Sequence, residues 1–106
     1  MAMERSQIQN PATIKYVDLI VACVKKHLGD CKIYLFGSRA ENKDREGSDV
    51  DIALDLNRKI NFKTIVQIND ELVMSKLPVF VDIIDIHEAS PALRDQIKKH
   101  GILWKS

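Results

Sequence analysis

The stretch of sequence that decides the fold runs from residue 37 to residue 54 and reads GSRAENKDREGSDVDIAL. It opens with Gly37 and Ser38, continues for ten residues, and then reaches Asp49 and Asp51, where acidic and hydrophobic residues alternate. A period of two predicts a strand with one core face and one acidic face. The two aspartates are therefore expected on the same side of that strand.

This pair of carboxylates has two interpretations. Two like charges held together raise each other's pKa or require a cation between them. Carboxylate oxygens are the ligands that Mg²⁺ prefers, which favours a metal site. The alternative is a solvated strand end, because a chain with ten aspartates has about one Asp-x-Asp pair by chance.

Gly37 and Ser38 follow a β-prone run at residues 32–36, and we expect a short helix to begin there. Glycine lets the backbone approach a ligand closely, and a helix N-terminus with a hydroxyl group favours phosphate. Arg39 adds a cation that can pair with phosphate oxygens. By itself this pattern favours a simple glycine turn with a serine cap. Its combination with the Asp-x-Asp pair at this spacing has a chance expectation of only ~0.002, and both halves fit one ligand, a triphosphate with its metal ions.

A third carboxylate is expected from a neighbouring strand. Residues 79–86 form a β-branched run interrupted only by Asp82 and Asp85. An unpaired charge in such a run is costly, and metal coordination or service as a general base would explain Asp82. Asp85 points to the opposite face by strand parity and is the alternative. Either residue could instead cap nearby backbone amides.

The rest of the chain predicts helices and strands around this centre. Hydrophobic periodicity and capping residues predict helices at residues 11–28, 62–75 and 91–99, and strands at 32–36, 50–56, 79–86 and 102–104. We expect the second helix to pack through a stripe of hydrophobic residues, Phe62, Ile65, Val66, Leu72 and Val73. This order predicts an α/β (α+β) fold, a small mixed sheet flanked by helices, as a single domain over residues 1–106.

Composition excludes several classes of protein. The 106 residues are 45% hydrophobic and 29% charged, with a net charge of +1, which argues against nucleic acid as a direct partner. No apolar run is long enough to span a membrane, and the first ten residues lack the apolar core of a signal peptide. Cys23 and Cys31 show neither metal-site nor disulfide spacing, and the three histidines have no spacing suited to a metal. We therefore expect a cytoplasmic protein.

The motifs resemble one family. Gly37-Ser38-Arg39-Ala40, the run from Ser48 to Leu54, and Val81-Asp82-Ile83-Ile84 resemble the minimal nucleotidyltransferase (MNT) family of the DNA polymerase beta-like superfamily. The resemblance implies the nucleotidyltransferase fold and transfer of a nucleoside monophosphate from a nucleotide, ATP by default. It also implies that Asp49, Asp51 and Asp82 are catalytic and hold two Mg²⁺ ions. Gly37 and Ser38 would contact the triphosphate, with Arg39 and Ser48 as further candidates.

The resemblance also implies a partner. Stand-alone MNT proteins resemble antitoxins that transfer AMP to a tyrosine of a helical HEPN-type ribonuclease toxin, with which they form a hetero-oligomer. Two alternatives stay open: an antitoxin that acts by binding alone, and a nucleotidyltransferase whose acceptor is RNA or a small aminoglycoside-like molecule. One departure from the family pattern is the run Glu41-Asn42-Lys43, where members often have a basic residue and a glycine. Lys43 or Arg45 would then replace the missing positive charge.

Overall fold

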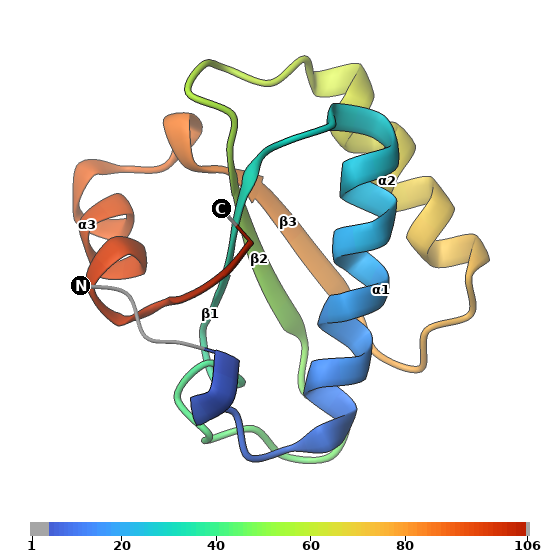
Figure 1. Cartoon of the computed structure of the whole chain (residues 1–106), viewed down its shortest axis with the longest axis vertical. Coiled ribbons are helices and arrows are strands. Elements are labelled where there is room, and N and C mark those ends of the chain that lie inside the picture. Colours follow the sequence, from blue (N-terminus) through green and yellow to red (C-terminus); the bar gives the residue numbers. More distant parts are fainter. Residues whose placement is uncertain (1–4, 106) are drawn as a thin grey trace.

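The computed structural model describes residues 5–105 and contains one sheet with helices on both faces (Figure 1). In chain order the elements are η1 (Arg5–Gln7), α1 (Pro11–Leu28), β1 (Lys32–Phe36), β2 (Val50–Asp55), α2 (Phe62–Met74), β3 (Val81–Asp85), η2 (Ile86–Glu88), α3 (Pro91–His100) and β4 (Ile102–Lys105). The helix boundaries follow the predicted caps, since Asn10, Asn61 and Ser90 each accept a backbone N–H at a helix start.

The sheet is mixed, as predicted, with the strand order β3-β2-β1-β4. β1 is antiparallel to both β2 and β4, whereas β2 and β3 are parallel. The carboxyl end of β1 therefore lies beside the amino ends of β2 and β3. This arrangement brings the turn after β1 close to the acidic residues at the start of the other two strands.

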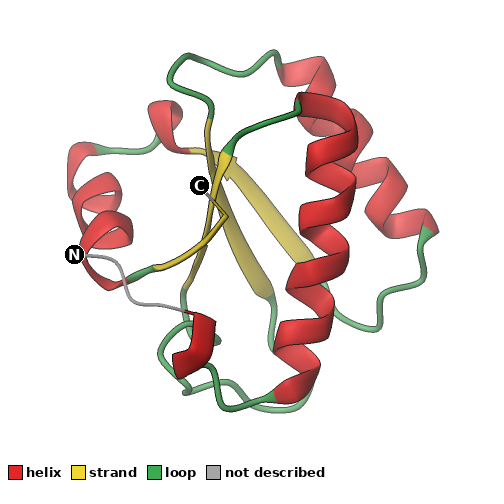
Figure 2. Cartoon of the chain, viewed as in Figure 1, coloured by secondary structure: helices red, strands yellow, loops and turns green. Residues whose placement is uncertain are grey.

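The two faces of the sheet are covered by different helices. α1 and α2 lie on one face and α3 on the other, on opposite sides of the strands in Figure 2. The main core lies under α1 and α2, where Ile20, Leu35, Ile52 and Ile68 are fully buried. A smaller cluster around Tyr34, Ala53, Ile86 and Ile97 lies under α3. None of the helices within residues 5–105 has the length and hydropathy needed to cross a membrane.

The predicted hydrophobic stripe of α2 was only partly right. Ile65 and Leu72 are buried, and Ile68 completes the packed face. Phe62, Val66 and Val73 instead face solvent, with exposed fractions of 76%, 39% and 77%. The sequence contains two hydrophobic stripes on this helix, and only one of them is covered by the sheet and α1.

The predicted short helix after Gly37 was wrong. Residues 37–48 form turns and irregular loop between β1 and β2. A single helical turn starts at Gly37, whose carbonyl accepts the N–H groups of Ala40 and Glu41. It ends at Asn42, which has a φ of 56°. The Asn42 amide then bonds outside the loop, so the chain turns back toward the start of α1 rather than continuing as a helix.

Candidate active site

The carboxylates of the predicted site meet on the face of the sheet opposite α1 and α2. Asp51 on β2 and Asp82 on β3 are direct register partners in the parallel pair. Asp49 immediately precedes β2. Burial, the charge of Asp82 and the charge of Asp49, in that order of importance, raise the pKa of the Asp51 carboxyl. The fold thus places a half-buried carboxylate between two exposed ones, an arrangement that a cation would stabilise.

Gly37 lies directly against the Asp51 carboxylate. Its φ is 76°, a value that favours glycine, and a Cβ atom at this position would collide with Asp51 Oδ2. Phe36, the preceding residue, is the register partner of Asp51 on β1. The glycine is therefore required for close approach of the loop to the Asp51 carboxylate, a reason that the sequence pattern alone did not reveal.

Hydrogen-bond donors beside Gly37 replace the expected helix N-terminus. The backbone N–H groups of Ser38 and Arg39 donate to no carbonyl within residues 5–105. The Ser38 hydroxyl likewise makes no hydrogen bond in the described part of the chain, while the Ser38 carbonyl accepts from Glu41 and Lys43. Successive free N–H groups in a tight turn bind anions well. This turn can therefore receive phosphate oxygens without a helix behind it.

The Arg39 side chain is buried, whereas a phosphate ligand would be expected to be accessible. Its side chain is 3% exposed, and its three guanidinium nitrogens are engaged within the protein. Nε and Nη2 donate to the Ser48 carbonyl at 3.0 and 2.9 Å, and Nη1 donates to Thr13 Oγ1 at 2.7 Å. Asp44 Oδ2 lies 3.6 Å from Nη1, and the Tyr16 ring lies against the guanidinium group. Arg39 therefore ties the loop to α1.

Ser48 belongs to the same loop framework. Its Oγ accepts the Arg45 N–H at 2.8 Å, and its own N–H donates to the Arg45 carbonyl. These bonds close the turn that leads directly into Asp49 and β2. Ser48 thus fixes the entry to the acidic strand, and a contact of Ser48 with phosphate stays a prediction.

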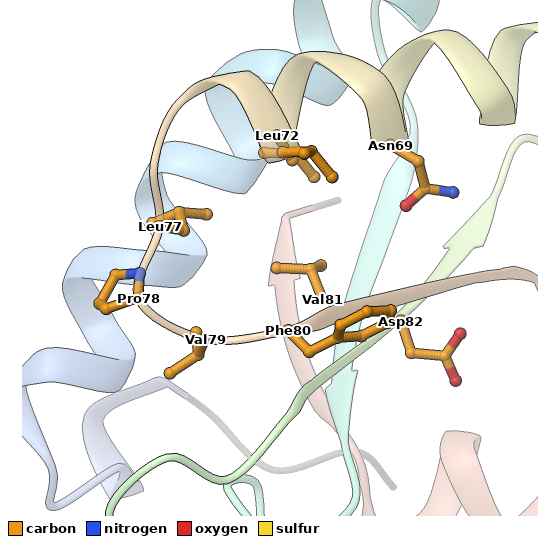
Figure 3. A pocket seen from close by; sticks show the side chains of 9 residues that line it. Asn69, Leu72, Leu77, Pro78, Val79, Phe80, Val81 and Asp82 are labelled. Atoms are coloured by element: carbon orange, nitrogen blue, oxygen red, sulfur yellow. The ribbon is translucent and has the colours of Figure 1, made fainter.

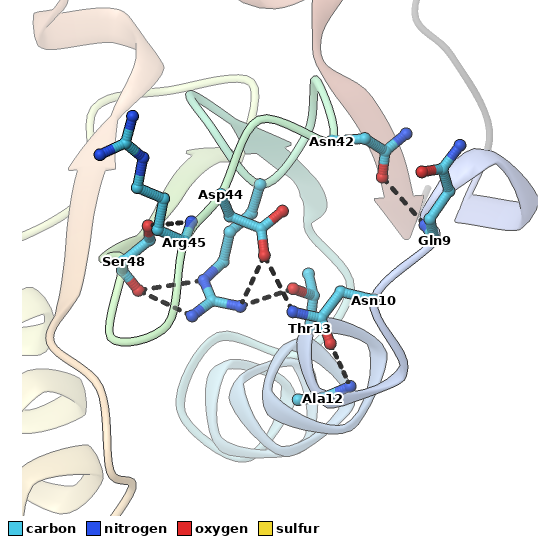
Figure 4. A network of polar contacts seen from close by, with 9 residues as sticks. Gln9, Asn10, Ala12, Thr13, Asn42, Asp44, Arg45 and Ser48 are labelled. Carbon is cyan, nitrogen blue, oxygen red and sulfur yellow. Dashed lines mark hydrogen bonds and ion pairs between the residues drawn. The ribbon is translucent and has the colours of Figure 1, made fainter.

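The departure at residues 41–43 is explained in part by the loop contacts. Asn42 Nδ2 donates to the Gln7 carbonyl at 2.8 Å, and the Gln9 N–H donates to Asn42 Oδ1 at 2.9 Å (Figure 4). Glu41 lines a cavity of about 240 Å³ beside Gly37, and Lys43 Nζ lies 3.8 Å from its carboxylate. Asn42 is therefore structural, and Lys43 partly offsets the negative charge of Glu41.

Asp85, the alternative third carboxylate, is used differently. It is buried, Oδ2 accepts the Ile60 N–H at 2.7 Å, and Oδ1 accepts the His87 N–H at 3.0 Å. It caps two backbone segments and does not share a face with Asp51, as strand parity predicts. Asp82 is exposed and is the residue that lies beside Asp51.

A second group of metal-capable side chains was missed in the sequence. Cys23, His27 and Glu71 offer ligand atoms within 4.8 Å of one another, between α1 and α2. Burial and Glu71 raise the pKa of the Cys23 thiol to about 12, and the Lys26 ammonium lies 2.9 Å from Glu71. A protonated thiol and an ion-paired carboxylate are poor ligands for Mg²⁺. This group links two helices and lies on the other face of the sheet from Asp51.

These features define a nucleotidyltransferase domain, and comparison with known families agrees. The family model for the polymerase beta nucleotidyltransferase domain matches residues 18–106. The chain belongs to this family. A search of curated proteins gave no match.

Solved structures with the same fold include toxin–antitoxin complexes. A toxin–antitoxin complex with AMP-PNP matches with a TM-score of 0.70 and 26% identity, over 84% of this chain and 73% of the other. The complex of a tri-AMPylated HEPN toxin of Shewanella oneidensis with its MNT antitoxin gives 0.66 and 24%, over 89% and 73%. A minimal nucleotidyltransferase gives 0.66 and 23%, over 91% and 97%. The last two likenesses concern the fold alone.

Proposed function

We propose that this chain is a Mg²⁺-dependent nucleotidyltransferase that transfers AMP from ATP to a tyrosine hydroxyl of a HEPN-type ribonuclease toxin, and so acts as its antitoxin in a hetero-oligomer. The observation that carries the proposal is the register pairing of Asp51 with Asp82, with Gly37 directly against the Asp51 carboxylate. The AMP-PNP complex and the AMPylated toxin among the structural neighbours favour this substrate and this partner.

The donor set fits divalent magnesium. All three proposed ligands, Asp49, Asp51 and Asp82, are carboxylates. Burial first, and then the charges of Asp82 and Asp49, raise the pKa of the Asp51 carboxyl, and a bound cation would offset all three of these effects. When bound, Mg²⁺ neutralises charge on phosphate oxygens and lowers the pKa of a coordinated hydroxyl group. Three carboxylates provide enough oxygen atoms to hold two such ions.

The protein's own groups orient the reactants. The Ser38 hydroxyl and the N–H groups of Ser38 and Arg39 would hold the β- and γ-phosphates, which leave as pyrophosphate. Asp82, the exposed carboxylate next to Asp51, would accept the proton of the acceptor hydroxyl as its oxygen attacks the α-phosphorus. One P–O bond forms to the acceptor and the bond to pyrophosphate breaks, so this chain supplies no covalent nucleophile.

The test is label transfer. The chain is incubated with Mg²⁺ and a HEPN-type toxin, using ATP labelled at the α-phosphate in one reaction and at the γ-phosphate in a second. We expect the toxin to retain the α-label only, and EDTA or Asp51→Asn to abolish the transfer. Asp30→Asn, an exposed aspartate between α1 and β1, is the control and should transfer normally.

A double variant of the proposed metal ligands separates inhibition of the toxin by catalysis from inhibition by binding alone. If the Asp49→Asn/Asp51→Asn double variant still protects cells from the toxin, the catalytic account fails and an antitoxin that acts by binding alone is favoured. Label on added RNA or on an aminoglycoside, with none on the toxin, would instead favour the other acceptor classes.

A further inference from the structure

An apolar groove lies along the β3 edge of the sheet, and its lining includes Asp82 (Figure 3). It has a volume of about 570 Å³ and runs between the second half of α2 and the segment that leads into β3. Its walls include the side chains of Leu72, Val73, Leu77, Val79 and Phe80, and Asp82 is the charged residue of the lining. The volume is in the range of pockets that enclose a drug-sized group.

The lining of this groove includes exposed hydrophobic side chains. Among the described residues six large hydrophobic side chains are exposed, and five of them lie on α2 or just before β3. They are Phe62, Val66, Val73, Met74 and Phe80, and the sixth is Leu19 on α1. Of these, Val73 and Phe80 line the groove, and exposed hydrophobic side chains in a concave site indicate a binding surface rather than chance exposure.

Phe80 lines the groove two residues before Asp82, the proposed general base. Residues 80 and 82 are two apart on an extended segment, so their side chains point to the same side. Figure 3 shows Phe80 and Asp82 on the same segment along the groove, and Phe80 is 72% exposed. An acceptor that lies in the groove and reaches Asp82 would therefore also contact Phe80.

The chemistry of the lining selects the kind of acceptor. The lining residues contain no lysine or arginine, which a nucleic acid backbone would require. Apolar walls and an exposed phenyl ring instead suit a hydrophobic segment of a protein. An aromatic ring packs against Phe80 by stacking or edge-to-face contact, and a phenol on that ring would present its hydroxyl group to Asp82.

We propose that this groove is the acceptor subsite: it binds a hydrophobic protein segment whose tyrosine ring packs on Phe80, with the hydroxyl group directed at Asp82. The inference rests on the proposed function, because it assigns the acceptor side of the same site. Phe80 and Val73 are positioning residues in this scheme. The phenol oxygen gains the α-phosphoryl group, its proton passes to Asp82, and pyrophosphate leaves from the opposite side.

A kinetic experiment tests the positioning role. Phe80→Ser and Val73→Lys change exposed side chains and should leave the fold intact, which circular dichroism checks. We expect each to raise KM for the HEPN-type toxin about tenfold or more, with KM for ATP unchanged. Phe62→Ser is the matched control, because Phe62, at the start of α2, is about as exposed as Phe80 (76% against 72%) but does not line the groove. Equal KM values for Phe80→Ser and Phe62→Ser would overturn the proposal.

A binding experiment tests the groove without any nucleotide transfer. We expect p-cresol, the side chain of tyrosine, to shift amide signals of Val73, Leu77 and Phe80 in NMR spectra of the labelled chain. The shifts should be lost in Phe80→Ser and kept in Phe62→Ser. Shifts elsewhere, or shifts unchanged by Phe80→Ser, would refute the subsite. If p-cresol binds as expected while no label reaches any acceptor, the proposed function fails and the subsite stands.

Discussion

The Asp51 carboxylate occupies the space that a side chain at Gly37 would need. A Cβ atom built on Gly37 meets Oδ2 and Cγ of Asp51, and the φ of Gly37 is 76°. Two residues that are far apart in the motif are thus in direct contact. The glycine sets how closely the loop after β1 approaches the central carboxylate of the proposed metal site.

Gly37→Ala should therefore displace Asp51. A shift of about 1 Å in a catalytic group costs on the order of 100-fold in rate, and we expect a loss of that size in nucleotide transfer. Gly47→Ala is the matched control, since Gly47 has a φ of 81° but no atom within 4 Å of a built Cβ. Both variants carry the same backbone strain, so equal losses of activity would contradict the specific role of Gly37.

Removing one of the clustered charges should stabilise the metal-free protein. Asp82 is the register partner of Asp51 and contributes to its raised pKa. We expect Asp82→Asn to increase the free energy of unfolding in EDTA by up to about 1 kcal/mol, because like charges on adjacent strands repel. Added Mg²⁺ should stabilise the wild-type chain and have little effect on the variant. Urea unfolding with and without Mg²⁺ measures both, and equal stabilisation by Mg²⁺ would argue against Asp82 as a ligand.

The order of secondary structure could be predicted because its signals are local. Asn10 before Pro11 starts α1, and alternation around Asp51 marks β2; both features lie in a few adjacent residues. The loop after Gly37 was harder. Its conformation depends on Asn42 and Arg39, each of which has a partner at or just before the start of α1, and no local pattern indicates such contacts.

The guanidinium group of Arg39 is engaged within the protein, and a contact of Arg39 with phosphate stays a prediction. Its replacement by alanine would leave the buried Asp44 carboxylate without its cation and two loop contacts unmade. We expect Arg39→Ala to destabilise the fold by about 3–5 kcal/mol, the usual cost of breaking a buried ion pair. Arg45→Ala, at an exposed position of the same loop, should have little effect. Thermal unfolding separates this prediction from a phosphate-binding role, in which Arg39→Ala would leave stability unchanged and lower only the affinity for ATP.

The face of α2 that points to solvent shows the limit of pattern reading on a single chain. Phe62, Val66 and Val73 recur at helical spacing just as a core stripe does, yet they are exposed. Hydrophobic periodicity indicates which faces of a helix are packed against other residues. It does not indicate whether those residues belong to the same chain or to a partner. In the proposed function, the partner would pack against part of this exposed face of α2.

Glu41 offers a route to tighter nucleotide binding. Glu41 closely follows the Ser38 and Arg39 N–H groups that would bind phosphate in the proposed function, and its carboxylate lies 3.8 Å from the Lys43 ammonium. We expect Glu41→Gln to lower KM for ATP up to about fivefold, because removing a solvent-exposed like charge yields at most about 1 kcal/mol. The gain should shrink as salt is added. Glu46→Gln, an exposed glutamate later in the loop, is the control. An unchanged or raised KM in Glu41→Gln would place the phosphates elsewhere.

Asp55 should make the stability of the fold depend on pH in the acid range. The Asp55 side chain is buried, and burial by itself raises its pKa. Its Oδ1 is hydrogen-bonded to the Asn57 N–H at 2.9 Å and to the His87 ring at 3.0 Å. These two contacts outweigh burial, so the pKa of Asp55 lies below the ordinary 3.8. A lowered folded-state pKa stabilises the protein above pH 3.8, and this contribution is lost as the pH falls through the folded value. Asp55→Asn should therefore cost about 1–3 kcal/mol at neutral pH, with a smaller difference from wild type at about pH 3. Urea unfolding at the two pH values measures the difference in the free energy of unfolding between wild type and Asp55→Asn. Asp95→Asn, at an exposed position, is the control. A difference that stays constant with pH would show that the charge of Asp55 is not what stabilises the fold.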